Sequence, residues 1–341
     1  MKEHNSNNDI LEPKKNNSIP NEVSGFDKSF AEDVKSGLQA EQKYLSSKYL
    51  YDKKGDAIFQ QIMDMEEYYP TRCEYEIFEM HKAEMLKYFS EQVKQFDLIE
   101  FGAGDGMKTK VLLKHFLQEK AHFNYVPIDI SANIVKTLTS DLYENMPDLS
   151  VKGICDDYFS AFDKLEASEE ETRKVVLFLG ANIGNFNPQE SITFLKKVAS
   201  YFSPGDRLLI GFDLRKDPQR ILDAYFDKHG ITRSFKLNLL ERINRELGGN
   251  FDVDKFQYFP IYDPIEGAIR SHLVSKVEQE VYIKALDESF HFEAWEAMFM
   301  ERSQKYSVSE IYQMAEKAGF RCLHHFYDSR EYFTDSLWTL A

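Results

Sequence analysis

Hydrophobic positions in the middle of the chain fall into short apolar runs, and the residues between those runs repeat hydrophobic positions at helical spacing. Short apolar runs predict buried strands, and the spacing between them predicts amphipathic helices. We therefore predict strands at residues 98–101, 125–130, 149–154, 175–179 and 207–212. This alternation is typical of an α/β fold with a doubly wound, Rossmann-like parallel sheet and right-handed crossovers.

The segment before this alternation predicts helices. They are expected at residues 26–46, 57–65 and 74–88. Pro70 disfavours helical geometry in the preceding residue, so we expect Tyr69 to lie outside the third helix. Thr71 is then placed to cap that helix with its hydroxyl.

The segment after residue 213 breaks the alternation and predicts an inserted α+β lobe. Helices are expected at residues 222–229, 239–247 and 307–320, and strands within residues 256–285. Gly230 and Gly248 would be the C-caps of the first two helices, and Ser307 and Gly319 would cap the third. We expect closing strands at residues 322–326 and 337–340 to return to the sheet.

These patterns predict three parts of the chain. Residues 1–24 are rich in Asn, Lys, Glu and Ser, which predicts a disordered tail. Residues 25–72 and 214–305 would form a substrate-binding domain. Residues 73–213 and 306–341 would form a cofactor-binding domain.

A glycine-rich turn follows the first predicted strand and precedes a predicted helix. It contains Gly102, Gly104 and Gly106, and Asp129 ends the next strand, 27 positions after Gly102. Glycine allows close approach of the backbone to a ligand, and a strand-end carboxylate can accept both hydroxyls of a ribose. The spacing matches neither the dinucleotide fingerprint nor a P-loop. The turn therefore predicts a nucleoside-binding site, and Glu-x-Gly-x-Gly with a strand-end acid resembles the S-adenosylmethionine-dependent methyltransferases.

The composition argues against several classes of binding partner. The 341-residue chain has 57 acidic and 42 basic residues and a formal net charge of −15, which argues against a nucleic-acid or anionic-membrane surface. No apolar run is long enough to span a membrane. Three widely spaced cysteines predict reduced thiols in a cytoplasmic protein, and the nine histidines suggest no metal site. We expect a monomer that binds a small molecule.

Several motifs, in order from residue 26 to the C-terminus, together resemble the histidine-specific Nα-methyltransferases of ergothioneine biosynthesis. These enzymes use S-adenosylmethionine to convert histidine into its trimethylammonium betaine, hercynine. The motifs include Tyr51-Asp52-x-x-Gly55-x-x-x-Phe59, Glu67-Tyr68-Tyr69-Pro70-Thr71-Arg72, Glu100-Phe101-Gly102-Ala103-Gly104, Val126-Pro127-Ile128-Asp129, Phe178-Leu179-Gly180, Ile183-Gly184-Asn185, Ala224-Tyr225 and Asn244-Arg245-Glu246-Leu247.

The resemblance implies a set of residues that bind S-adenosylmethionine. Gly102 and Lys108 would lie along the cofactor, Asp129 would accept its ribose hydroxyls, and Asp157 would lie against the adenine. Gly180 would pass under the sulfonium side.

The resemblance also implies a set of residues that bind the amino acid. Asn185 and Tyr225 would hold its carboxylate, and Tyr51 would face its amino group. Phe59 and Tyr68 would shape the pocket, with Tyr68 near the imidazole. These roles suit methyl transfer to an amine, because the reaction needs positioning within roughly 3 to 3.5 Å more than acid or base power.

The expected imidazole pocket departs from the family pattern. Glu301 and Ser303 match the ring-binding residues of the family, but Met300 replaces a threonine and Lys236 replaces an asparagine. Ser271 stands where the family has a methionine against the ring, so we expect a smaller and more polar wall there. These differences leave open methylation of a ring nitrogen, or of another amino acid such as tryptophan or tyrosine. A scaffold that keeps only the cofactor fold is a third reading.

Overall fold

The structure is a computed structural model that describes residues 26–166 and 172–341. The predicted tail at residues 1–24 lies outside the described residues. Within them, no helix is long and apolar enough to cross a membrane.

Eight strands of the described residues form the main sheet. They are β1 (Phe96–Phe101), β2 (Phe123–Asp129), β3 (Ser150–Val151), β4 (Ile154–Cys155), β5 (Arg173–Phe178), β6 (Arg207–Asp213), β12 (Phe320–Tyr327) and β13 (Phe333–Leu340). Their order is β12-β13-β6-β5-β1-β2-β3, with β4 also paired to β2. Strands β1 to β6 pair in parallel, whereas β13 runs antiparallel to both β6 and β12. The predicted α/β fold and the return of the closing strands are confirmed.

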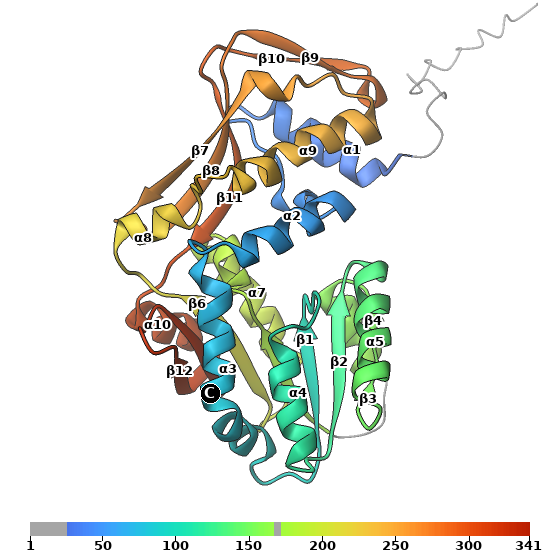
Figure 1. Ribbon diagram of the computed structural model, residues 1–341, viewed down its shortest axis with the longest axis vertical. Coiled ribbons are helices and arrows are strands. Elements are labelled where there is room, and N and C mark those ends of the chain that lie inside the picture. The colour runs from blue at the N-terminus through green and yellow to red at the C-terminus, as the bar shows by residue number, and fades with distance from the viewer. Residues whose placement is uncertain (1–25, 167–171) are drawn as a thin grey trace, which may run out of the picture.

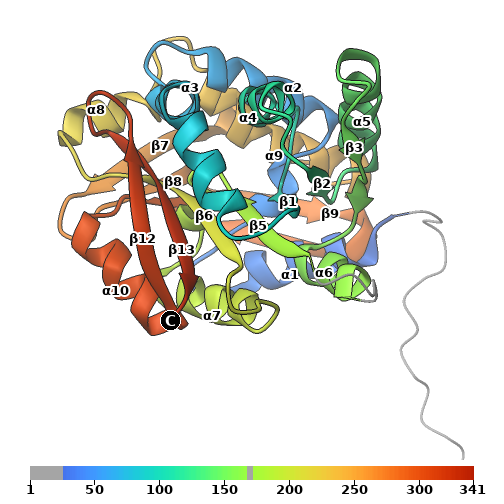
Figure 2. The same ribbon diagram turned by 90° about the horizontal axis from the view of Figure 1, so that it is seen from below.

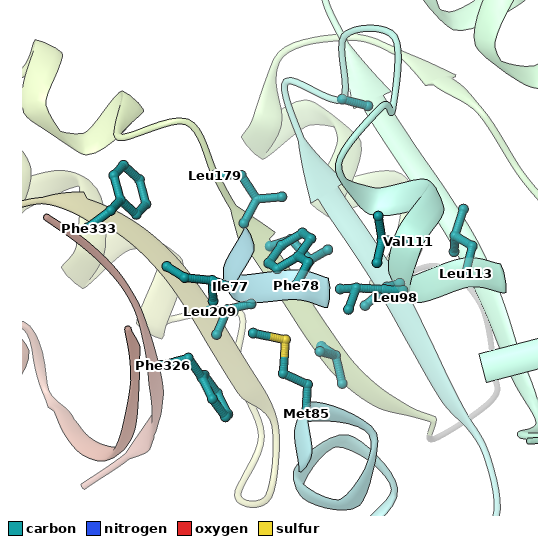
Figure 3. Close-up of a cluster of buried hydrophobic side chains, with 14 of the residues drawn as sticks. Ile77, Phe78, Met85, Leu98, Val111, Leu113, Leu179, Leu209, Phe326 and Phe333 are labelled. Carbon is teal, nitrogen blue, oxygen red and sulfur yellow. The ribbon is translucent and has the colours of Figure 1, made fainter. Parts of the chain in front are cut away.

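Helices cover both faces of this sheet, as Figure 2 shows. One face carries α3 (Tyr69–Ser90), α4 (Thr109–Gln118) and α5 (Ala132–Asn145), and the other carries α6 (Tyr158–Glu166), α7 (Pro188–Ala199) and α10 (Val308–Ala318). Figure 3 shows part of the first hydrophobic layer, where Ile77 and Phe78 of α3 pack against Leu209 of β6. Burial on both faces of the sheet explains the continuous hydrophobic run from Val175 to Phe178 in β5.

A second lobe lies beyond one end of the sheet (Figure 1). Its helical elements are α1 (Lys28–Gln39), η1 (Ser47–Leu50), α2 (Lys53–Asp64), α8 (Pro218–Asp223), α9 (Ile231–Leu247), η3 (Val253–Lys255) and η4 (Lys284–Leu286). Its strands are β7 (Phe256–Asp263), β8 (Ala268–Ser275), β9 (Gln279–Ile283), β10 (Glu288–Phe292) and β11 (Ala297–Gln304), arranged in two small sheets, β11-β8-β7 and β10-β9. A separate hydrophobic cluster joins residues from α1, α9 and these strands. The lobe therefore has a hydrophobic core of its own, and the predicted domain boundaries stay a prediction.

The start of α3 differs from the sequence prediction. Tyr69 is the first helical residue, Pro70 occupies the first turn, and Thr71 lies inside the helix instead of capping it. Proline is tolerated there because the first N–H groups of a helix have no intrahelical partner. Tyr69 is fully buried and donates its hydroxyl to Asp213 at 2.9 Å, so tertiary contacts outweigh the local preference against helix before proline.

The helices near residue 230 also differ from the prediction. Helix α8 starts at Pro218 and ends at Asp223, and α9 starts at Ile231. Gly230 adopts a left-handed conformation (φ 71°) at the start of α9, and is not the C-cap of a preceding helix. The carboxylate of Asp227 accepts the N–H groups of Ile231 and Thr232 at 2.8 and 2.9 Å, which explains why α9 begins there. Gly248 is the C-cap of α9, as predicted.

Two further boundaries were misplaced. The predicted strand at 149–154 is divided into β3 and β4, and the helix predicted at 57–65 is α2, whose N-cap is Asp52. The Asp52 carboxylate accepts the N–H of Gly55 at 2.7 Å, so the helix starts four residues earlier than expected.

Candidate active site

A pocket lies between the carboxyl ends of β5 and β6 and the second lobe. Ligands are expected at this edge of a parallel sheet. The residues after β5 and at the end of β6 form one side of it, and the lobe forms the other. Its lining contains most of the predicted substrate residues together with one cofactor residue: Tyr51, Phe59, Tyr68, Gly180, Asn185, Tyr225, Glu301 and Ser303.

The glycine-rich turn connects β1 to α4 beside this edge. Gly102, Gly104 and Gly106 all have positive φ values, of 67°, 55° and 65°. Gly102 donates its N–H to Ile128 at 2.8 Å, which ties the turn to β2. A Cβ atom added to Gly104 would meet no atom within 4 Å, so the space above the turn is open to a ligand.

Asp129 lies where β2 ends, next to this turn. Its carboxylate accepts the N–H of Ser131 at 2.9 Å and that of Gly104 at 3.3 Å. Burial raises the pKa of Asp129 above its usual value, against the opposing effect of these N–H groups. The residues here therefore fit the adenosine part of S-adenosylmethionine: an oriented carboxylate beside an open glycine turn.

The Asp129→Asn variant is expected to bind S-adenosylhomocysteine about 10- to 100-fold more weakly, because hydrogen bonds to charged groups contribute roughly 1.5 to 3 kcal/mol. Isothermal titration calorimetry measures this change. The matched control is Asp148→Asn, which changes an exposed aspartate in the loop before β3. Equal affinities of the two variants would contradict the assignment of Asp129 to the ribose.

Glu100, in the same motif, points into the core instead of toward the ligand. It is 3% exposed and accepts hydrogen bonds from Thr109 (2.7 Å) and from the hydroxyl of Tyr125. Burial outweighs these hydrogen bonds and raises the pKa of Glu100 to about 7. Glu100 therefore helps to fix the turn from below.

This pKa makes stability depend on pH. Because the folded pKa is raised, the protonated carboxyl of Glu100 stabilises the folded state. This contribution is complete below the unfolded pKa of about 4.3 and is lost as pH rises through the folded pKa, a change of roughly 3 kcal/mol. The Glu100→Gln variant is expected to lack this loss. Its free energy of unfolding, relative to wild type, should therefore rise by about that amount between pH 5 and pH 8.5. Denaturant titrations at both pH values measure it, with Glu119→Gln, an exposed glutamate after α4, as the control that should show no such rise.

Lys108 and Gly180 meet at a buried carboxylate that the sequence analysis did not identify. Glu74 of α3 is completely buried, pairs with Lys108, and accepts the N–H of Gly180 at 2.8 and 3.0 Å. A Cβ atom on Gly180 would lie 3.6 Å from the Lys108 amine and 3.6 Å from the amide nitrogen of Asn182. Glu74 thus brings the loop after β5 against the loop after β1. Its position inside a predicted amphipathic helix gave no sign of this role.

Asn185 reaches the pocket from η2 (Asn182–Asn185), the turn that follows β5. Gly184 packs against β11 so closely that a Cβ atom would lie 2.8 Å from the carbonyl oxygen of Gln304. Because Gln304 follows Ser303, this contact places Asn185 beside the strand that carries Glu301 and Ser303. The preference for glycine at position 184 is therefore explained by packing.

A buried network joins Tyr225 to Ser303. The amine of Lys305 is fully buried and lies 2.7 Å from the Tyr225 hydroxyl, 2.8 Å from the Ser303 hydroxyl and 2.8 Å from the Asp213 carboxylate. Tyr225 also donates to Ser303 at 2.8 Å. Burial raises the pKa of Tyr225 well above 10, so its hydroxyl remains a donor at neutral pH. The sequence analysis assigned no role to Lys305.

Glu301 forms an ion pair with Lys236, the residue that replaces the family's asparagine. The side chain of Lys236 is 2% exposed and that of Glu301 is 12% exposed, and both line the pocket. The pair joins α9 to β11 across the lobe side of the pocket.

Aromatic rings form the remaining walls. Tyr51 lies edge-on to Phe59 and to Phe235, with ring centroids 5.5 Å apart in both cases. Tyr68 lies edge-on to Tyr225 at 6.2 Å. Although Tyr51 is 38% exposed, desolvation by the surrounding protein, and secondarily the Glu301 carboxylate, raise the pKa of its hydroxyl above 10. Tyr51 therefore presents a neutral hydroxyl, which can accept a hydrogen bond from an amine.

The predicted cofactor residues Gly102, Lys108 and Asp129 lie outside this pocket, at or beside the glycine-rich turn, and Ser271, Met300 and Asp157 do not line it either. Ser271 is 1% exposed and lies 3.1 Å from the hydroxyl of Tyr258, and Met300 is buried in the hydrophobic cluster of the lobe. The expectation that Ser271 forms a polar wall of the ring pocket is therefore not supported. Asp157 is exposed and accepts the N–H groups of Phe159 and Ser160 at 3.0 and 3.1 Å in the first turn of α6. Its contact with adenine stays a prediction.

Known proteins of one family match almost the whole described chain. The family model of S-adenosylmethionine-dependent histidine-specific methyltransferases matches residues 30–340. The chain is 33% identical to the histidine N-alpha-methyltransferase of Mycolicibacterium smegmatis, over 87% of this chain and 90% of the relative. It is also 33% identical to the enzyme of that name from Mycobacterium tuberculosis, over 89% and 93% of the two chains.

A third relative is longer. Ergothioneine biosynthesis protein 1 of Schizosaccharomyces pombe is 31% identical, over 81% of this chain but 36% of the relative. The two bacterial relatives match along nearly their whole length, and the family model covers almost the entire described region. The chain therefore belongs to the family of S-adenosylmethionine-dependent, histidine-specific methyltransferases.

Proposed function

We propose that the protein transfers methyl groups from S-adenosylmethionine to the α-amino nitrogen of L-histidine, up to the trimethylated betaine hercynine. The single observation that carries this proposal is the composition of the pocket. Tyr51, Asn185 and Tyr225 lie in the same pocket as Glu301 and Ser303. One pocket thus contains groups suited to an amine, a carboxylate and an imidazole.

S-adenosylmethionine supplies an electrophilic methyl group when it is bound. The glycine turn, Lys108 and Asp129 would hold it at the carboxyl ends of β1 and β2. Gly180 would border it on the side of the pocket. The close contact of Gly180 with Lys108 supports this continuity between the two sites.

The protein's own residues would position the amine. Asn185 and Tyr225 donate to the substrate carboxylate without carrying charge, and the neutral hydroxyl of Tyr51 accepts from the amino group. Close approach of an oriented amine to the methyl carbon supplies much of the rate acceleration. Glu301 and Ser303 bind the ring, and a substrate that leaves such polar groups unpaired is rejected.

The geometry does not favour another amino acid as the acceptor. That alternative rested on Ser271 and Met300, and neither residue lines the pocket. A scaffold role is disfavoured as well, because the groups expected for all three parts of histidine are present together.

Mass spectrometry tests the proposal. The protein is incubated with S-adenosylmethionine and, separately, with histidine, Nα,Nα-dimethylhistidine, tryptophan or tyrosine, and the products are fragmented to locate the methyl groups. We expect up to three methyl groups on the α-nitrogen of histidine and one on dimethylhistidine. Methylation of the ring, or turnover with tryptophan or tyrosine alone, would overturn the proposal.

We also propose that the protein acts as a cytoplasmic monomer without nucleic acid or membrane. The net charge of −15 supports the absence of nucleic-acid and membrane partners, because anionic surfaces would repel such a chain. Sedimentation equilibrium of the purified protein tests the monomeric state.

A further inference from the structure

The ion pair between Lys236 and Glu301 changes what the ring end of the pocket can bind. One carboxylate oxygen of Glu301 accepts from Lys236. The other has no hydrogen bond to any described residue, and Glu301 lines the pocket. A ligand therefore finds one free acceptor oxygen on a carboxylate whose charge is already balanced by a lysine.

Ser303, next to Glu301 along the pocket wall, has the opposite polarity. Its oxygen accepts from the amine of Lys305 at 2.8 Å and from the hydroxyl of Tyr225 at 2.8 Å. A serine oxygen has two acceptor lone pairs and one hydrogen. Lys305 occupies one lone pair, and the other is released when Tyr225 donates to the substrate carboxylate as proposed above. The hydrogen of the Ser303 hydroxyl remains for a ligand, so Ser303 can donate to a ring nitrogen.

Resting on the proposed function, we propose that Lys236 is a specificity-determining residue that makes the pocket select the neutral imidazole of the substrate and exclude the imidazolium. A neutral imidazole has one N–H donor and one acceptor nitrogen, which match Glu301 and Ser303. An imidazolium has two donors and no acceptor nitrogen, so it cannot accept the hydrogen of Ser303. It would also place a second cation on the carboxylate that Lys236 neutralises.

Burial and neighbouring groups shift the pKa values of the other ionisable groups around this pair away from neutral pH. Burial raises the pKa of the nearby tyrosines well above 10: Tyr51, Tyr68, Tyr225 and Tyr258. Burial lowers the pKa of His272 on β8. Asp52 and Asp227 are partly buried, but N–H donors keep their pKa below the usual value. Burial would raise the pKa of Asp213, but Lys216 and Lys305 keep it low.

The experiment uses hercynine, the trimethylated betaine, as the probe. Its α-nitrogen carries no titratable proton, so its ring is the ligand group that changes charge near neutral pH. Its dissociation constant is measured by calorimetry between pH 5.5 and 8.0, with saturating S-adenosylhomocysteine. For the wild type we expect the affinity for hercynine to weaken roughly tenfold as the pH is lowered from 8.0 to 5.5, because an imidazole of pKa about 6.5 becomes protonated.

Three variants separate the role of Lys236 from a structural one. Lys236→Met leaves Glu301 unpaired, so we expect the imidazolium to bind well and the tenfold weakening to disappear or reverse. Lys236→Arg keeps the cation and should keep the wild-type profile. The double variant Lys236→Met/Glu301→Gln removes both charges and should again favour the neutral ring.

The outcomes distinguish this inference from the proposed function. A wild-type affinity for hercynine that does not change with pH, or a Lys236→Met variant that keeps the tenfold weakening, would overturn the role of Lys236 while leaving histidine methylation intact. If neither histidine nor hercynine binds at pH 8.0, the proposed function fails and this inference fails with it.

Discussion

The Asp213→Asn variant is expected to lose about 3 to 5 kcal/mol of unfolding free energy, because removing one partner of a buried ion pair leaves uncompensated charge. Asp213 is fully buried and forms ion pairs with two buried lysines, Lys216 and Lys305. Burial would raise its pKa, but these lysines hold the pKa below its usual value, so the group is ionised at neutral pH. Asparagine would leave both ammonium groups without their anion. Denaturant unfolding measured by circular dichroism gives the difference.

Two further variants make this result specific. Asp254→Asn changes an exposed aspartate in η3 and should alter stability by less than about 0.5 kcal/mol. Adding Lys216→Met to Asp213→Asn removes one of the stranded charges and should restore part of the lost stability. A single Asp213→Asn variant as stable as Asp254→Asn would show that the network contributes nothing to folding.

The Tyr51→Phe variant is expected to reduce kcat/KM for histidine about a hundredfold, because small errors in the position of a reacting amine have effects of that size. The ring packing against Phe59 and Phe235 is retained, and only the hydroxyl is lost. Affinity for S-adenosylhomocysteine should not change. Steady-state kinetics and calorimetry measure the two quantities.

The three methylation steps supply an internal comparison for Tyr51. Histidine and its monomethyl form keep an N–H that can donate to the hydroxyl, whereas neutral dimethylhistidine has none. The loss of rate should therefore be smaller with Nα,Nα-dimethylhistidine than with histidine. Tyr282→Phe is the matched control, because Tyr282 is 39% exposed and Tyr51 is 38% exposed. Equal kinetics of the two variants would rule out the assigned role of Tyr51.

The order of the elements was predictable because it depends on local pattern. Strand β5 has four apolar residues in succession, from Val175 to Phe178, and the start of α10 has a complete capping box between Ser307 and Glu310. The errors occur where a distant residue decides. Tyr69 is helical because its hydroxyl reaches Asp213, 144 positions away, and no local motif contains that contact.

The site was predicted unevenly for the same reason. Residues at strand ends, such as Asp129 and Asn185, share one edge of the sheet by topology, so their grouping followed from the pattern. Glu74 and Lys305 could not be assigned, because their roles depend on partners from other elements of the fold. Ser271 was misjudged because a sequence comparison does not show that Tyr258 lies beside its hydroxyl.

The Lys305 ammonium fixes the distance between two hydroxyl groups of the site. It lies 2.7 Å from the hydroxyl of Tyr225 and 2.8 Å from that of Ser303, so the spacing between these two groups does not depend on flexible loops. In the proposed orientation, one hydroxyl meets the carboxylate and the other meets the ring. The pocket would then select the length of the side chain. In homohistidine, which has one more methylene group, either the carboxylate could reach Tyr225 or the ring could reach Ser303, but not both at once.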